Sequence, residues 1–471
     1  MLFCWPCRHR MTTETPVTTE AIGQPPVPTP SRAEAFGFWL KLGFISFGGP
    51  AGQIAVMHEE LVERRRWISE NRFLHALNYC MVLPGPEAQQ LATYIGWLMH
   101  RTWGGLVAGG LFVLPSLFIL VALSWVYMAY GHVPVIAGLF YGIKPAVTAL
   151  VVHAAWRVGS RALKNAWLWA IAAGAFVAIF ALALPFPLIV LIAGVIGSVG
   201  GRVAPDKFKA GGGHGAARQS HGPALIDDHT PTPAHARFTW TRFRAVLLVF
   251  VAVWGAALST LTALYGWSGV LTQMGWFFTK AALLTFGGAY AVLPYVYQGA
   301  VDHYQWLSAT QMIDGLALGE TTPGPLIMVV AFVGFVGGWT KAIFGADALW
   351  LGGAVAAGVV TLFTFLPSFL FIFLGGPFIE STHGNLKFTA PLTGITAAVV
   401  GVIVNLAVFF AYHVLWPQGL GGHFEWLSAL IGLGAAAALF RFKLGVISVV
   451  AGAGLAGLLV QLGRSLLWAA G

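Results

Sequence analysis

Two lysines in matching positions are the side chains of this sequence best suited to bind a charged ligand. Lys41 and Lys280 each lie within an apolar segment, six residues before a Phe-Gly-Gly triplet. A charged side chain near the centre of a lipid bilayer costs roughly 3 kcal/mol, so such a residue usually serves a function. We expect the two ammonium groups to bind an anion. The alternative is that each long side chain extends to the membrane surface and is solvated there.

Both lysines belong to a stretch that occurs twice in the chain. Residues 41–86 recur at 280–325 with a constant offset of 239 and no insertion. A later Leu-Pro-Ser match, at 114–116 and 366–368, has an offset of 252, so the second copy is longer. We place its extra residues between Lys341 and Gly353. The chain is therefore built from two homologous halves.

Each copy is interrupted by a Gly-Gly pair and then by Pro-Gly-Pro. Proline and glycine break helices, and broken helices inside a bilayer are tolerated only around protein or a water-filled cavity. Paired breaks at corresponding places in two halves indicate the binding site of a transporter, although a kink for packing is the alternative. The predicted binding residues, besides the two lysines, are Gly48, Gly49, Gln53, Pro84, Gly85, Pro86, Gln89, Gly287, Gly288, Pro323, Gly324 and Pro325.

The composition is that of an integral membrane protein. The chain is 57% hydrophobic and only 9% charged, whereas soluble domains carry charge at roughly a quarter of their residues. The net charge of +9 lies mostly in short loops between apolar segments, so it reflects membrane orientation and not nucleic-acid binding. The three cysteines, Cys4, Cys7 and Cys80, form no disulfide framework, and we expect neither a metal site nor a cofactor.

The apolar segments predict an all-α polytopic fold with broken or re-entrant helices at the Gly-Gly and Pro-Gly-Pro motifs. One extra apolar segment between the halves inverts the second copy, which also lacks the arginines found near Arg65 in the first. Four, one and four spans suit the loop charges better than six, one and six. The expected domains are a disordered tail (1–33), the first repeat (34–202), a cytoplasmic linker with little to fold around (203–244), a linking helix (245–266) and the second repeat (267–471).

Two carboxylates flank the Pro-Gly-Pro motifs without being repeat equivalents. Glu87 follows the first motif, and Glu320 precedes the second by three residues. Glu87 could stabilise a helix N-terminus through the dipole. Both could instead couple transport to a proton, because a carboxylate in a low-dielectric site can take up a proton near neutral pH.

The motifs resemble those of the chromate ion transporter family in its two-domain form. The matching residues are Phe47-Gly48-Gly49-Pro50, Arg65-Arg66-Trp67, Pro84-Gly85-Pro86 with Gln89 or Gln90 after it, and Thr322-Pro323-Gly324-Pro325. The resemblance extends over about 36–462. Two departures are Gln53, where family members often have histidine, and Gly287-Gly288-Ala289, which lacks the proline of the first copy.

The resemblance implies a secondary active transporter that exports chromate across a bacterial-type inner membrane, gives chromate resistance and is coupled to an ion gradient. From the two carboxylates we expect the coupling ion to be a proton. Chromate is a tetrahedral dianion, and sulfate has nearly the same charge and shape, so uptake or exchange of sulfate or another oxyanion is the alternative. A membrane-embedded oxidoreductase is a more remote alternative, because the sequence has no paired ligands for haem or an iron–sulfur cluster and no nucleotide-binding fingerprint. Whether the chain forms a homodimer stays open.

Overall fold

In the computed structural model, the described residues are 28–47, 49–208, 223–228, 230–286, 288–382 and 389–470, with side chains described up to 464. Within these ranges the chain is all α-helical, as predicted, and its one β-type contact is an isolated bridge between Ile68 and Ile226. The elements of the two halves follow one another in the same order.

The first half contains seven α-helices and a π-helical segment. They are α1 (Arg32–Ile45), α2 (Gly49–His58), η1 (Glu59–Arg64), α3 (Glu70–Val82), α4 (Glu87–Tyr130), α5 (Pro134–Ala162), α6 (Ala166–Phe180) and α7 (Phe186–Val203). The helices α1, α2, α3 and α4 are separated at the Gly-Gly and Pro-Gly-Pro motifs. Each motif therefore breaks a helix, as the sequence predicts.

The second half repeats this order after a linking helix, α8 (Trp240–Tyr265). Its elements are α9 (Val270–Leu283), α10 (Ala289–Tyr297), η4 (Gln298–His303), α11 (Ala309–Thr321), η5 (Leu326–Met328), α12 (Val329–Thr340), α13 (Leu349–Thr382), α14 (Thr389–Leu415), α15 (Trp426–Phe440) and α16 (Val446–Ala470). Even the π-helical segments η1 and η4 occupy equivalent positions, 239 residues apart.

The long helix α4 is two helices joined by a tight turn. His100 and Arg101 have non-helical backbone angles, and the two limbs then pack so closely that a Cβ atom on Gly96 would lie 2.5 Å from the Gly104 carbonyl oxygen. In the second half, α12 and α13 form the equivalent pair and are joined by a longer connection that begins at Lys341. The extra residues of the second copy lie there, within the predicted range.

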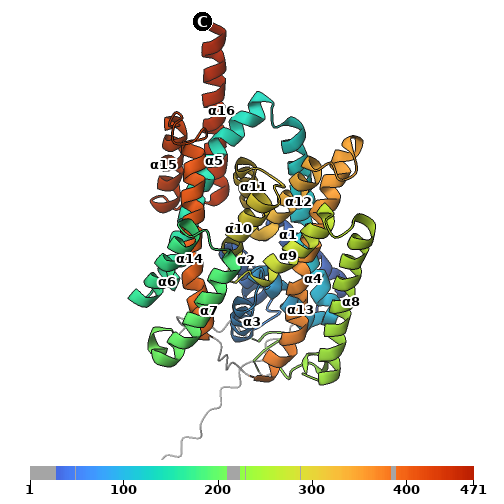
Figure 1. Ribbon diagram of the computed structural model, residues 1–471. Coiled ribbons are helices and arrows are strands. Elements are labelled where there is room, and N and C mark those ends of the chain that lie inside the picture. The colour runs from blue at the N-terminus through green and yellow to red at the C-terminus, as the bar shows by residue number, and fades with distance from the viewer. Residues whose placement is uncertain are drawn as a thin grey trace, which may run out of the picture.

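Equivalent helices lie at opposite ends of the molecule. In Figure 1, α3, α6 and α7 lie in the lower part, whereas their counterparts α11, α15 and α16 lie in the upper part. The two halves are thus arranged as inverted repeats, with their breaks near the middle. The linking helix α8 lies along one side (Figure 1).

The outer helices present a broad apolar surface. Among the described residues, seven helices are long and apolar enough to cross a membrane, and α6, α12 and α15 are shorter apolar helices. Helix α8 buries only Leu258. Large apolar side chains exposed on α6, α7 and α8 include Trp167, Trp169, Leu191, Val195, Leu248 and Val249. Exposed apolar surface of this extent fits lipid contact, so the chain is a multi-pass membrane protein.

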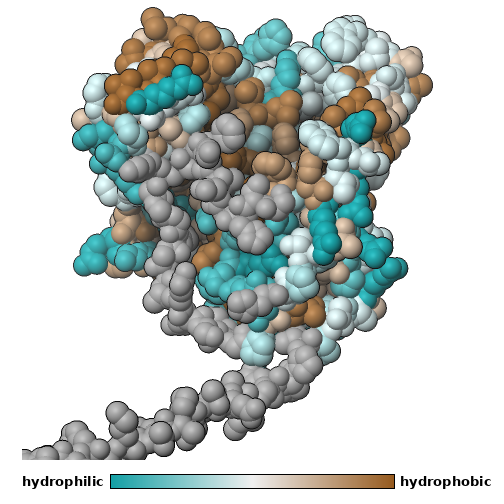
Figure 2. All heavy atoms as spheres, turned by 90° about the horizontal axis from the view of Figure 1, so that it is seen from below, coloured by the Kyte–Doolittle hydropathy of each residue, from teal (hydrophilic) through white to brown (hydrophobic). Residues whose placement is uncertain are grey.

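Part of the linker packs against the first half. The backbone N–H of Ile226 donates to the Trp67 carbonyl at 3.1 Å, and that of Ser69 donates to the Ile226 carbonyl at 2.9 Å. The His235 Nε2 atom lies 2.9 Å from the Trp97 carbonyl oxygen. The expectation of a linker with little to fold around does not describe this segment, because the turn before α3 leaves backbone groups that pair with it. Seen from this end, hydrophilic side chains gather across the face (Figure 2).

Candidate functional site

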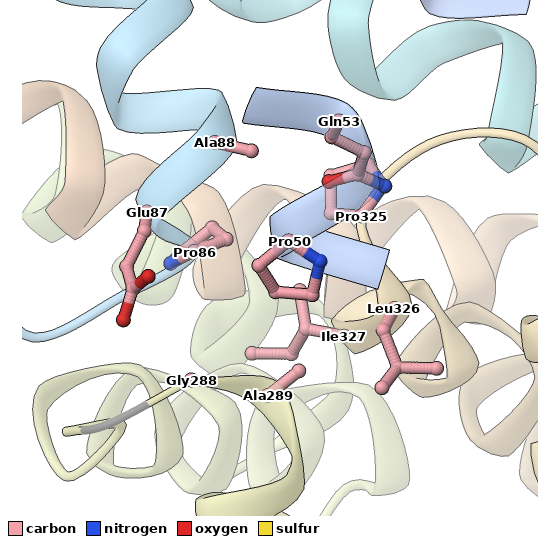
Figure 3. A pocket seen from close by; sticks show the side chains of 10 residues that line it. All are labelled: Pro50, Gln53, Pro86, Glu87, Ala88, Gly288, Ala289, Pro325, Leu326 and Ile327. Carbon is pink, nitrogen blue, oxygen red and sulfur yellow. The ribbon is translucent and has the colours of Figure 1, made fainter. Parts of the chain in front are cut away.

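A small pocket lies where the four helix breaks meet (Figure 3). It is lined by Pro50, Gln53, Pro86, Glu87, Ala88, Gly288, Ala289, Pro325, Leu326 and Ile327. Eight of these residues form four repeat pairs with the offset of 239, for example Pro50 with Ala289 and Pro86 with Pro325. The pocket therefore lies on the pseudo-twofold axis that relates the two halves.

The two halves exchange hydrogen bonds beside this pocket. The backbone N–H of Gly85 donates to the Thr285 carbonyl at 2.7 Å, and that of Gly324 donates to the Ser46 carbonyl at 2.7 Å. Gly85 and Gly324 are repeat equivalents, as are Ser46 and Thr285. Each Pro-Gly-Pro loop thus caps the first helix of the opposite half, so the breaks of both halves are held together.

The central position of each Pro-Gly-Pro loop requires glycine, because a side chain does not fit there. Their φ angles are +127° for Gly85 and +97° for Gly324, a region that favours glycine. A Cβ atom on Gly85 would lie 2.7 Å from the Ser368 Oγ, and one on Gly324 would lie 2.8 Å from the Ser116 Cβ. The loop of each half therefore packs on the long helix of the other half.

Four helical segments begin at the pocket. They are α2 at Gly49, α4 at Glu87, α10 at Ala289 and η5 at Leu326. The first backbone N–H groups of a helix have no partner within it, and the helix dipole places partial positive charge at this end. Anions bind readily at such ends. The side chain of Gln53 adds another amide, whose Nε2 donates to the Gly324 carbonyl.

The two predicted carboxylates have different surroundings. Glu87 is half-buried and lines the pocket on the side away from Gln53 (Figure 3), and it makes no hydrogen bond or ion pair with the residues that the structure describes. Glu320 is buried behind the second break and does not line the pocket. Its carboxylate accepts a hydrogen bond from the Tyr290 hydroxyl. Tyr290 belongs to α10, which begins at the pocket.

The structure does not bring the two predicted lysines into the pocket. Lys41 is exposed, because α1 packs through Phe38, Trp39 and Leu42 and turns Lys41 to the other side. Lys280 is half-buried, with its ammonium group 5.6 Å from the centre of the Trp276 ring.

The remaining predicted residues divide between the pocket and its supports. Gln89 is buried, and its Nε2 donates to the Thr93 Oγ1 at 3.0 Å, outside the pocket lining. Gly49 begins α2 beside the pocket, whereas Pro84, Gly85, Pro323 and Gly324 form the loops behind it. Gly48 and Gly287 lie outside the described residues.

Arg157 is a residue at this site that the sequence interpretation missed. A Cβ atom on Gly49 would lie 3.9 Å from the Arg157 Nη2, and Gly49 precedes the pocket residue Pro50. Arg157 also interacts electrostatically with Glu320 and Tyr290. The sequence places Arg157 at the boundary of a loop, but α5 continues to Ala162. The available signal was an arginine directly after an apolar run.

A buried carboxylate joins the halves at the end where the linker packs. Glu380 of α13 is 3% exposed and lies 2.7 Å from the Arg72 Nη1 of α3. It also accepts a hydrogen bond from the Tyr94 hydroxyl of α4. Arg72 further donates to the carbonyl oxygens of Asp227 and Thr230 in the linker. This cluster ties the two halves and the linker together.

A second buried carboxylate joins the halves near the other end. Asp314 of α11 is 2% exposed and accepts a hydrogen bond of 2.8 Å from the Tyr127 hydroxyl of α4. The Lys144 Nζ of α5 lies 3.5 Å from the same Asp314 oxygen, Oδ2. Both clusters link a short helix of one half to the long helix of the other.

The part of the chain that the structure describes contains no set of side chains that could bind a metal ion. No three His, Cys, Asp or Glu side chains come together there as a metal ion would need. Cys80 is buried and unpaired with another cysteine, and Cys4 and Cys7 lie outside the described residues.

Comparison with known proteins places this architecture in a family. The family model for the chromate transporter matches residues 33–198 and 272–458, one region in each half. A chromate transport protein of Pseudomonas aeruginosa is 34% identical over 459 residues, which cover 96% of this chain and 97% of the relative. A chromate transport protein of Cupriavidus metallidurans is 30% identical over 446 residues, or 94% of this chain and 96% of the relative. No solved structure matches. The chain belongs to the chromate transporter family.

Proposed function

We propose that this protein is a secondary active transporter that exports chromate across a bacterial-type inner membrane and so gives chromate resistance. The observation that carries the proposal is the pocket on the pseudo-twofold axis, where four helical segments begin between two inverted halves. Inverted-repeat transporters bind their substrates at such repeat interfaces. Relatives that match nearly the whole chain are named as chromate transport proteins.

The chemistry of the pocket favours a tetrahedral oxyanion. Chromate offers only acceptor oxygens, and helix N-termini offer unpaired N–H donors together with partial positive charge. We assign the binding of these oxygens to the backbone N–H groups that follow Pro50, Pro86, Gly288 and Pro325, with Gln53 as a polar neighbour. Lys41 and Lys280 then raise the positive potential of the approaches without contacting the bound anion.

A proton is the coupling ion in this proposal, and Glu87 and Glu320 are its carriers. Glu87 takes up a proton as the anion leaves, because a carboxylate in a site of low dielectric can be protonated near neutral pH. Glu320 lies behind the second break with Tyr290 as its hydrogen-bond donor. The proton is lost to the opposite side before the next anion binds, so proton and anion move in opposite directions.

Transport of radiolabelled chromate into everted membrane vesicles tests the proposal. An acid-inside gradient should drive uptake that is absent from vesicles without the protein and reduced by excess sulfate. Uptake only into right-side-out vesicles would overturn the direction and support the alternative of sulfate or oxyanion uptake. No uptake of either anion in either orientation would contradict the transport function.

The enzyme alternative has its own test. A redox enzyme acting on chromate would show a cofactor absorbance band in the purified protein and would consume chromate without moving it across the membrane. We expect neither result.

A further inference from the structure

The guanidinium group of Arg157 lies beside the start of α2, next to the residues that line the pocket. It approaches the first turn of α2, where a Cβ atom on Gly49 would be 3.9 Å from Nη2. It also acts electrostatically on Glu320 and Tyr290, which belong to the second half. Arg157 therefore places a basic group beside the Gly-Gly break of the first half.

Arg157 forms no ion pair with any of the described residues. Three other arginines of the first half are paired there: Arg64 with Glu59, Arg65 with Glu60 and Arg72 with Glu380. Arg157 is half-buried near the end of an apolar helix, and an unpaired charge in such a place is costly. The cost is offset when an anion binds.

We propose that Arg157 binds the oxyanion directly, and that Glu320 is the internal anion with which the substrate competes for its charge. This inference rests on the proposed function and adds a specificity-determining residue to it. The planar guanidinium donates two parallel hydrogen bonds to two oxygens of a tetrahedral anion, which a lysine cannot do. In this proposal, backbone N–H groups at the starts of α2 and α10 supply donors for the remaining oxygens.

The role of Arg157 predicts selectivity for charge. A dianion gains more than a monoanion from a guanidinium in a site of low dielectric. Sulfate and perchlorate have the same tetrahedral shape but carry two charges and one. Wild-type protein should therefore be inhibited more strongly by sulfate than by perchlorate, and Arg157 should be the source of the difference.

The test measures chromate flux in proteoliposomes that contain the full chain, with sulfate and perchlorate as competitors. The variants are Arg157→Gln and Arg157→Lys, and the matched control is Arg161→Gln, which removes an exposed arginine one turn further along the same helix. We expect Arg157→Gln to raise the half-saturating chromate concentration on the order of 30-fold. The ratio of sulfate to perchlorate inhibition should fall towards one, and the control should behave as wild type.

Two outcomes overturn the inference. One is an unchanged half-saturating concentration and an unchanged inhibition ratio in Arg157→Gln; the other is the same loss in Arg161→Gln. If Arg157→Gln does not fold, Arg157→Lys decides, because it keeps the charge but loses the second hydrogen bond, and an unchanged chromate affinity contradicts the assignment. If wild-type protein moves no oxyanion, the proposed function fails, and equilibrium dialysis of the purified variants with chromate still tests Arg157.

Discussion

The packing of the second Pro-Gly-Pro loop on the opposite half leads to a prediction about Gly324→Ala. Gly324 has a φ of +97°, and a Cβ atom there would lie 2.8 Å from the Ser116 Cβ of α4. Left-handed backbone costs a non-glycine residue about 1–2 kcal/mol. The clash adds about 1–3 kcal/mol, because α4 must move or the loop must withdraw.

Gly345 provides a matched control for this substitution. Its φ is +90°, and nothing lies within 4 Å of a Cβ atom at that position. Gly345→Ala therefore pays the backbone cost of about 1–2 kcal/mol without the clash. The difference between the two variants isolates the packing of the loop on the opposite half.

The assay is the free energy of unfolding of the purified protein in detergent, together with chromate flux in vesicles. We expect Gly324→Ala to lose more stability than Gly345→Ala and to lose most of its flux. Ser116→Gly removes the atom that clashes, so it should restore part of both losses in the double variant. Equal destabilisation by the two glycine substitutions, or no restoration by Ser116→Gly, would refute the contact between the halves.

Four further predictions concern the clusters, the predicted carriers, the lysines and the linker. Glu380→Ala leaves the largely covered Arg72 without its carboxylate partner and should cost about 3–5 kcal/mol in unfolding free energy, whereas Glu59→Ala at the exposed Arg64 pair should cost at most about 1 kcal/mol. Similar values would contradict the buried cluster. Glu320→Gln keeps a hydrogen-bond partner for Tyr290 but loses the carboxylate charge, so chromate flux should no longer respond to an imposed proton gradient. An unchanged response would show that Glu320 does not take part in the coupling. Lys41→Ala and Lys280→Ala should each reduce flux less than Arg157→Gln, because Lys41 is exposed and Lys280 lies over Trp276, whereas Arg157 approaches the first turn of α2. A larger loss in the lysine variants would reverse this order. Burial lowers the pKa of His235 in the linker, so the unfolded linker takes up a proton more readily than the packed one. The packing of the linker should therefore weaken as the pH falls through about 6.5, and proteolysis of the linker should become faster. His235→Gln should abolish this pH dependence.

The repeat and its breaks could be predicted from the sequence because they depend on local chemistry. A constant offset of 239 identified equivalent residues, and proline and glycine identified the breaks. That Pro50, Pro86, Ala289 and Pro325 line one pocket also requires the breaks to lie near the twofold axis, which the structure shows and the offset does not fix. Local residue types were sufficient for the repeat and the breaks.

The positions of the two lysines and of Arg157 relative to the pocket could not be predicted from the sequence. Helix α1 is apolar on nearly all sides, so its sequence does not say which face packs and which way Lys41 points. Arg157 looked like a loop residue because its place depends on where α5 ends, and helix ends are the least certain feature of a sequence interpretation. The contacts of Gly324 with Ser116 and of Arg72 with Glu380 join residues far apart in the chain, and no local pattern encodes them.

The central claim is that the oxyanion binds on the pseudo-twofold axis where the four breaks meet. Chromium anomalous scattering from crystals of the protein soaked with chromate tests it most directly. We expect a single strong peak in the pocket between Pro50, Pro86, Ala289 and Pro325, within hydrogen-bonding reach of Arg157. An ordered peak elsewhere in the protein, with none in this pocket, would contradict the account.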